Sequence, residues 1–275
     1  MKIFFTIFMQ SLVKLLKVEV SPKAFIAVVT LNNPSTRNSL TERMGNEFTS
    51  LIRSDVMCDP LIRSVVLTGE GTAFSAGGDV NFLRNRLSDT VDGNIRAMRS
   101  FYQKFLVVRE IPVPVVAALN GHAIGAGFCV ALACDIRVAL SQGKYSVNFT
   151  QLGIHPGMGA TYFLPRLIGE SKAHKMLLTG EQIDGQQSVD LGIAAKCFSQ
   201  PQEVVDSAMN IARSIAMASS VAVRETVKTF RLEDRGALER ALQRESEAQA
   251  VCYGEKMDLD EALNALAAKR EPKFV

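Results

Sequence analysis

Short runs of β-branched and other apolar residues alternate with helical stretches through the first two thirds of the chain. The expected strands are Ala24–Leu31, Ser64–Thr68, Pro114–Leu119 and Ile136–Ala139. Helices are expected between them at Glu42–Ser54 and Thr90–Val108. Strands and helices that alternate in this way form a mainly parallel sheet with helical crossovers. The sequence therefore predicts an α/β fold.

Beyond about residue 201 the pattern changes to helices alone. Mostly apolar residues recur there at helical spacing in three segments. They are Val204, Ala208, Ile211 and Ile215, then Leu238, Ala241, Leu242, Glu245 and Ala248, and finally Ala262, Leu263 and Leu266. We therefore predict three parts: an N-terminal extension at 1–17, an α/β core at 18–200 and a helical C-terminal subdomain at 201–275.

Charge and cysteine content exclude several classes of protein. The 31 Lys and Arg residues exceed the 28 Asp and Glu residues by only 3, and no run of five or six like charges occurs, so nucleic-acid binding is not expected. Cysteines and histidines show no CxxC pair or zinc-type spacing, which argues against a disulfide framework or a metal site. They are Cys58, Cys129, Cys134, Cys197, Cys252, His122, His155 and His174. A reducing compartment is expected: the cytoplasm, or the mitochondrion in a eukaryotic source.

The N-terminal segment Met1–Val13 is the one ambiguous targeting signal. It is apolar with a single lysine, and it is too short to span a bilayer. No small-residue cleavage site follows it. We expect an extension that is frayed or packed on the core, with a targeting remnant as the alternative. No later segment is apolar enough over sufficient length to cross a membrane.

A first small-residue turn follows a strand at Thr72–Val80, which reads TAFSAGGDV. Asp79 stands where it could cap a helix over Asn81–Leu87. Such a turn exposes N–H groups at a helix start, where the helix dipole favours negative charge. A purely structural tight turn fits the same residues, so this motif alone does not identify a site.

A second such turn lies within Pro112–Ala139. A buried strand ends at Asn120–Gly121, and Gly125-Ala126-Gly127 opens a small-residue helix that ends near Cys134–Asp135. Unpaired N–H donors are thereby placed at another helix start. Two such donors that converge on one carbonyl oxygen would form an oxyanion hole, which polarises a thioester and stabilises the anion derived from it.

These motifs resemble the crotonase (enoyl-CoA hydratase/isomerase) superfamily. The matching segments are FSAGGD, IPVPVVAALNGHAIGAG and ACDIRVA, with VTLNNPSTRNSL before them and LGIHPGMGATYFLPRLIG, LTGEQIDGQQSVDLGIAAKCF and AAKREPKF after them. They stand in the family's order and run from about residue 18 to the end. The resemblance implies a ββα spiral core with a helical C-terminal subdomain, and an acyl-CoA thioester as substrate without a prosthetic group.

The resemblance also implies roles for particular positions. The family's two oxyanion donors match the backbone N–H groups of Ala76 and Ala126. Positions that match the family's substrate-binding segments are Ala76, Gly77, Gly78, Asp79 and Gly125. Arg37 could approach the CoA phosphates, although an ordinary solvated arginine is the alternative, and Lys273 is a further candidate.

The chain departs from the family at the acid residues. Hydratases of the family use two glutamates to activate water, and the matching positions here are Cys129 and Phe149. Related isomerases and dehalogenases use an aspartate within the segment that matches His155–Thr161, which contains no Asp or Glu. The usual two-glutamate hydration is therefore not expected.

Several other polar groups remain as candidates. Cys129 lies one turn inside a helix N-terminus, where a thiolate can be stabilised, but a buried thiol is the alternative. His155 titrates near neutrality and matches a position near the acyl pocket, but a histidine satisfied in the core or in a loop is the alternative. Asn148 and Thr150 flank Phe149 and could position water, with ordinary hydrogen bonding in a turn as the alternative. Apolar residues that could line an acyl tunnel, or simply pack in the core, are Met98, Phe101 and Phe105.

Three functions are compatible with these features. The first is an enzyme of hydratase/isomerase type that stabilises a thioester enolate or oxyanion, with hydrolysis or decarboxylation also possible. The second is a non-catalytic acyl-CoA-binding protein, and the third is a structural partner in a mixed oligomer. The resemblance implies a homotrimer or a dimer of trimers, in which C-terminal helices cover a neighbouring active site.

Overall fold

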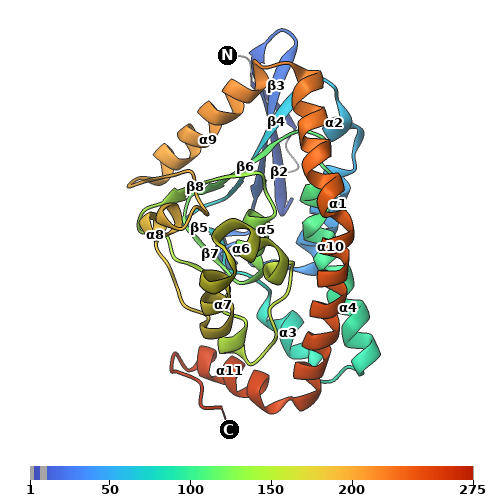
Figure 1. Cartoon of the computed structure of the whole chain (residues 1–275), viewed down its shortest axis with the longest axis vertical. Helices are drawn as coiled ribbons and strands as arrows, with labels where there is room; N and C mark the ends of the chain where they lie inside the picture. Colours follow the sequence, from blue (N-terminus) through green and yellow to red (C-terminus); the bar gives the residue numbers. More distant parts are fainter. Residues whose placement is uncertain (1–2, 7–10, 275) are drawn as a thin grey trace.

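The computed structural model describes residues 3–6 and 11–274. It contains a seven-stranded sheet in which β1, β2 and β3 are antiparallel and the remaining neighbours are parallel (Figure 1). In spatial order the strands are β1 (Ile3–Thr6), β2 (Val13–Ser21), β3 (Ala24–Leu31), β4 (Ile62–Gly69), β6 (Val115–Leu119), β8 (Ile136–Leu140) and β10 (Lys196–Phe198). A smaller parallel sheet joins β5 (Ala73–Ser75), β7 (His122–Ile124) and β9 (Tyr145–Ser146).

The predicted α/β fold is confirmed, including the four expected strands and the two expected helices. The helices are α1 (Glu42–Ile52) and α4 (Val91–Leu106), each a few residues shorter than predicted. Each begins at a threonine whose hydroxyl accepts a backbone N–H: Thr41 from Met44 and Thr90 from Gly93. Side-chain capping of this kind satisfies a donor that the helix itself leaves unpaired.

Both faces of the parallel sheet are buried, as the apolar runs of its strands require. In β4, Val65 and Leu67 face the main core, whereas Val66 faces a second core beneath α9 (Pro201–Ala216). Successive strand residues point to opposite faces, so one apolar strand serves both cores. Figure 1 shows α9 lying across one face of the sheet.

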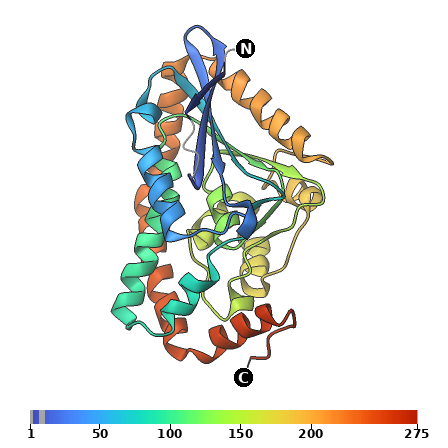
Figure 2. The same ribbon diagram turned by 180° about the vertical axis from the view of Figure 1, so that it is seen from behind.

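Each of the other helices contributes apolar residues to the main core, on the face opposite α9. They are α2 (Asp55–Cys58), α3 (Val80–Arg86), α5 (Ala126–Leu132), α6 (Ala160–Ile168), α7 (Glu170–Thr179), α8 (Gly185–Asp190), α10 (Ser220–Glu255) and α11 (Met257–Ala267). The 36-residue α10 runs lengthwise beside α4, and α11 folds back near the C-terminus (Figures 1 and 2). From Pro201 onward the described elements are therefore helices alone, as predicted.

The three-part division of the chain stays a prediction, although two details bear on it. Strand β2 begins at Val13, so residues 13–17 already belong to the main sheet. Part of the N-terminal segment considered as a targeting signal, residues 1–2 and 7–10, lies outside the described residues. Within the described ranges no helix combines the length and the apolar character needed to cross a membrane.

Candidate active site

The two small-residue turns lie against each other. Strands β5 and β7 pair in parallel, with Ser75 opposite Ala123, so both turns leave the small sheet at the same edge. Gly77 then passes so close to the second turn that an added Cβ would lie 2.7 Å from the Ile124 oxygen and 3.7 Å from the Ala126 nitrogen. A larger residue cannot take this place, which explains the glycine.

The second turn presents an unpaired donor at Ala126. This residue is the first of α5, a position whose N–H has no acceptor within the helix. The preceding Gly125 N–H is bonded to the Ser146 oxygen at 2.7 Å. No hydrogen bond among the described residues uses the Ala126 N–H. The expected donor at Ala126 is thus available.

The prediction that the Ala76 N–H is available to a substrate is wrong, because this N–H donates to the Arg37 carbonyl at 2.8 Å. The neighbouring donor on the cavity side belongs to Gly78. In the bridge between Leu40 and Gly78, Leu40 N–H donates to the Gly77 oxygen and Asp79 N–H donates to the Leu40 oxygen. This pattern turns the N–H of Gly78 away from Leu40.

Space also distinguishes Gly78 from its neighbours. A Cβ added there would meet nothing within 4 Å, so the backbone is open to an incoming group. No partner for its N–H occurs in the part of the chain that the structure describes. The available pair of backbone donors is therefore Gly78 and Ala126, which differs from the predicted pair by a shift of two residues in the first turn.

Asp79 confirms the predicted start of the next helix. Its carboxylate accepts the Phe82 N–H at 3.0 Å and caps α3, which begins at Val80. The cap fixes the direction in which α3 leaves the turn, and this places Val80 and Leu83 in the wall of a cavity that also includes Gly78.

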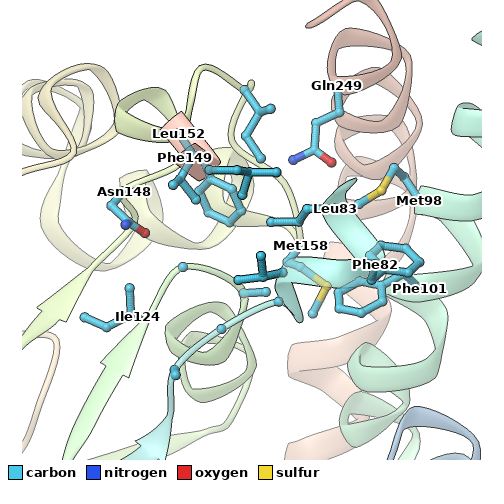
Figure 3. A pocket seen from close by; sticks show the side chains of 18 of the residues that line it. Phe82, Leu83, Met98, Phe101, Ile124, Asn148, Phe149, Leu152, Met158 and Gln249 are labelled. Atoms are coloured by element: carbon cyan, nitrogen blue, oxygen red, sulfur yellow. The ribbon is translucent and has the colours of Figure 1, made fainter. Parts of the chain in front are cut away.

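The cavity has a volume of about 170 Å³ and is mostly apolar. Figure 3 shows the side chains that converge on it from α3, α4, α10 and the segment around residue 150. The principal apolar residues are Phe82, Leu83, Met98, Phe101, Phe149 and Met158. Met98 and Phe101 thus line the cavity as predicted, whereas Phe105 packs in the core against Phe101 with ring centroids 5.1 Å apart.

Exposure distinguishes the mouth of the cavity from its interior. Val80 and Leu266 are 39% and 55% exposed, whereas Tyr102, Gln249 and Tyr253 are almost completely buried. Leu266 lies on α11, so the last helix of this chain borders its own cavity. That the C-terminal helices also cover a neighbouring active site stays a prediction.

The positions that match the family's glutamates have different environments. Phe149 lines the cavity, but Cys129 is absent from its wall. Beside Phe149, Asn148 lines the cavity with its Oδ1 3.3 Å from a Cβ placed on Gly125. No partner for the Asn148 amide occurs among the described hydrogen bonds. Thr150 instead donates to the Leu177 oxygen at 3.3 Å and borders a surface groove.

Cys129 is a buried thiol and not a stabilised thiolate. Its side chain is 0% exposed and approaches the Gly157 oxygen at 3.6 Å. Burial and the nearby Glu245 raise the pKa of Cys129 well above its usual range. The loss of solvent contact therefore outweighs the favourable helix N-terminus.

This environment predicts a pattern of cysteine reactivity. In the native protein we expect iodoacetamide to modify the exposed Cys58 readily and to spare Cys129 and Cys134, where burial raises the pKa of Cys134 to about 12. Peptide mass spectrometry before and after unfolding measures this. Labelling of Cys129 at the rate of Cys58 in the folded protein would contradict the assignment.

His155 lies behind the cavity and not in it. Its ring borders a surface groove together with Ile154 and Pro156. Burial lowers the pKa of His155, which favours the neutral ring. The predicted proximity to the acyl pocket is therefore indirect, through the backbone of this segment.

Glu245 is a buried carboxylate that the sequence prediction placed in an apolar helix stripe without a role. It lies on α10, is 1% exposed, and accepts the Gly159 N–H at 2.7 Å and the Thr161 N–H at 3.0 Å. The Thr161 hydroxyl donates to it as well, at 2.5 Å. Glu245 thus caps the N-terminus of α6 from another helix. A charged residue in an apolar stripe was the signal available in the sequence.

The remaining predicted contacts lie at the surface. Arg37 and Lys273 are both exposed, and their contact with CoA stays a prediction. Within the described residues, no group of three or more His, Cys, Asp or Glu side chains is arranged to hold a metal ion.

Comparison with known proteins gives a consistent result. The family model for enoyl-CoA hydratase/isomerase matches residues 22–275. A probable enoyl-CoA hydratase of Bacillus subtilis is 31% identical over 250 residues, which cover 91% of this chain and 95% of the relative. The crotonyl-CoA hydratase of Syntrophomonas wolfei is 31% identical, with 91% and 94% covered.

Solved structures agree with this. The crystal structure of enoyl-CoA hydratase from Bacillus halodurans superimposes with a TM-score of 0.81 at 28% identity and covers 93% of this chain and 100% of that one. The fold, the turns at the edge of the small sheet and the relatives all lead to one assignment. This chain belongs to the enoyl-CoA hydratase/isomerase family.

Proposed function

We propose that the chain is an enzyme that binds a short acyl-CoA and polarises its thioester carbonyl with the N–H groups of Gly78 and Ala126. The observation that carries this proposal is the presence of two unpaired backbone donors in the wall of one apolar cavity. Donors that are fixed before the substrate arrives stabilise charge that develops on the oxygen without reorganising. Membership of an acyl-CoA family supplies the substrate class.

The cavity wall favours reactions that need no protein carboxylate. Its polar side chains are Asn148, Tyr102, Gln249 and Tyr253, and none of its described lining residues is Asp or Glu. Two-glutamate hydration is therefore disfavoured. Enolate formation by loss of CO₂ suits this wall: the bond between Cα and the carboxylate breaks, its electron pair forms the enolate C=C bond, and the carbonyl π pair moves to the thioester oxygen. When the carbonyl re-forms, water protonates Cα, and the released CO₂ takes up the hydroxide as bicarbonate.

Other parts of the proposal rest on the family resemblance. Arg37 is the candidate for the CoA phosphates, and the turn from Ala76 to Asp79 is the candidate for the pantetheine. A homotrimer or dimer of trimers and a cytoplasmic location complete it. One alternative is that the chain hydrolyses a CoA thioester. The other is that it binds acyl-CoA without catalysing a reaction.

A panel of acyl-CoA thioesters tests the proposal. We expect calorimetry to detect binding of butanoyl-CoA, and at least one thioester of the panel to be consumed, because the site holds donors for the anion. An α-carboxyacyl-CoA incubated in D₂O should yield a product with one deuterium at Cα, measured by mass spectrometry. Tight binding without consumption of any thioester would favour the non-catalytic alternative, and absence of binding would refute the proposal.

A further inference from the structure

Gln249 is one of four polar side chains in the wall of a mostly apolar cavity. It lies on α10 and is 1% exposed. Its Nε2 donates to the His155 carbonyl at 2.7 Å, and its Oε1 accepts the hydroxyl protons of Tyr102 at 2.8 Å and Tyr253 at 3.3 Å. The buried amide is therefore well satisfied by protein partners.

Gln249 lies on the opposite side of the cavity from the turn that carries the Ala126 N–H. Figure 3 shows Gln249 across the cavity from Ile124. Gly157 makes room for it, because an added Cβ there would lie 2.5 Å from the Tyr102 hydroxyl oxygen and 2.7 Å from Gln249 Nε2. The hydrogen-bonded side chains of Gln249 and Tyr102 thus close the buried end of the cavity.

A surface groove lies on the other side of this closed end. Ile154 borders both the cavity and the groove, and His155 borders the groove. The segment 154–156 is therefore the partition between the two spaces. Gln249 holds this partition against α10 through its hydrogen bond to the His155 carbonyl.

We propose that Gln249 determines the length of the acyl chain that the cavity accepts, by filling its buried end and holding the partition 154–156 in place. This inference rests on the proposed function. A cavity of about 170 Å³ is close to the engineered apolar cavity of about 150 Å³ that holds benzene, so it suits an acyl chain of about four to six carbons. A longer chain would have to displace Gln249 and break its hydrogen bonds.

Binding of a series of saturated acyl-CoA thioesters, from acetyl to dodecanoyl, tests this by calorimetry. In the wild-type protein the affinity should rise about fourfold per added methylene and stop rising at about six carbons. In Gln249→Ala the rise should continue, so that decanoyl-CoA binds at least about tenfold more tightly than it binds the wild type. The affinity for decanoyl-CoA relative to that for butanoyl-CoA, measured in each protein, is the readout of chain length.

Two further variants keep the test decisive. Gln243→Ala, an exposed glutamine on the same helix, is the matched control and should retain the wild-type profile. Ile154→Ala thins the partition without removing the amide, and it should also extend the accepted length if Gln249→Ala does not fold.

The possible results separate the two proposals. If the wild type binds short thioesters but both variants keep its length profile, the role of Gln249 is refuted while the proposed function stands. A wild-type protein that already prefers decanoyl-CoA would refute the role of Gln249 in the same way. If no thioester of any length binds, the proposed function itself fails.

Discussion

Ala126→Pro should reduce kcat/KM by about 100- to 1,000-fold, the loss typical when one oxyanion donor is removed. Proline lacks the N–H, and Ala126 is the first residue of α5, where proline is well tolerated because that N–H is unpaired within the helix. The substitution therefore deletes one donor while the helix can still form. Steady-state kinetics on the thioester that the panel identifies, with circular dichroism to confirm folding, measure the effect.

Ala126→Gly is the matched control, because it removes the methyl group and keeps the N–H. We expect it to retain activity within about tenfold, since glycine at a helix start changes backbone flexibility but not the donor. A folded Ala126→Pro variant with unchanged kcat/KM would show that this amide does not bind the thioester oxygen. Equal losses in both variants would indicate a packing effect instead.

The free energy of unfolding should fall by about 2–3 kcal/mol between pH 5 and pH 8 because of Glu245. Burial raises the pKa of Glu245 to about 7, although the hydrogen bonds from Thr161 and Gly159 oppose this, while the unfolded value is 4.5. The folded protein thus binds a proton that the unfolded chain releases. Stability from this group is complete below pH 4.5 and is lost as the pH rises through 7.

The surroundings of Glu245 support this direction. Tyr102 from α4 and Cys129 from α5 face it, and the pKa values of both are raised, so they stay neutral over this range. Neither group offers a positive charge to favour the carboxylate. Denaturant titrations at a series of pH values measure the change in the free energy of unfolding.

Glu245→Gln is the control, because it retains an acceptor oxygen for α6 but cannot titrate. The difference in unfolding free energy between wild type and variant should depend on pH, favouring the wild type more strongly at pH 5 than at pH 8. Taking this difference removes the contributions of other groups, such as His155, whose lowered pKa acts in the opposite direction. A difference that is constant with pH would contradict the raised pKa.

Much of the fold could be predicted because its signals are local. A few neighbouring residues are enough to recognise the apolar runs of β3, β4, β6 and β8. The same holds for Asp79, which caps α3. The small-residue turns also indicated where backbone donors would be found. Ala126 follows from its position at a helix start, since that position defines the unpaired N–H.

Other parts of the site depend on contacts between distant segments. Whether Ala76 or Gly78 offers its N–H is decided by the pairing with residues 37–40, and a shift of one residue reverses which amides face a partner. Gln249 lines the cavity, and Glu245 caps α6, from α10, a helix that is separated from α5 by four further helices. No local pattern specifies which side of that helix meets the cavity.

The amides of Gly78 and Ala126 are main-chain groups, and this gives the proposed anion-binding step a property that side-chain donors lack. Neither amide gains or loses a proton at any pH at which the protein is folded, so their ability to donate hydrogen bonds does not depend on pH. Any bell-shaped or sigmoidal rate profile must then originate in the substrate or in a side chain elsewhere. Substitution of the side chains around the cavity can likewise change which substrate reacts, because it leaves these two main-chain donors in place.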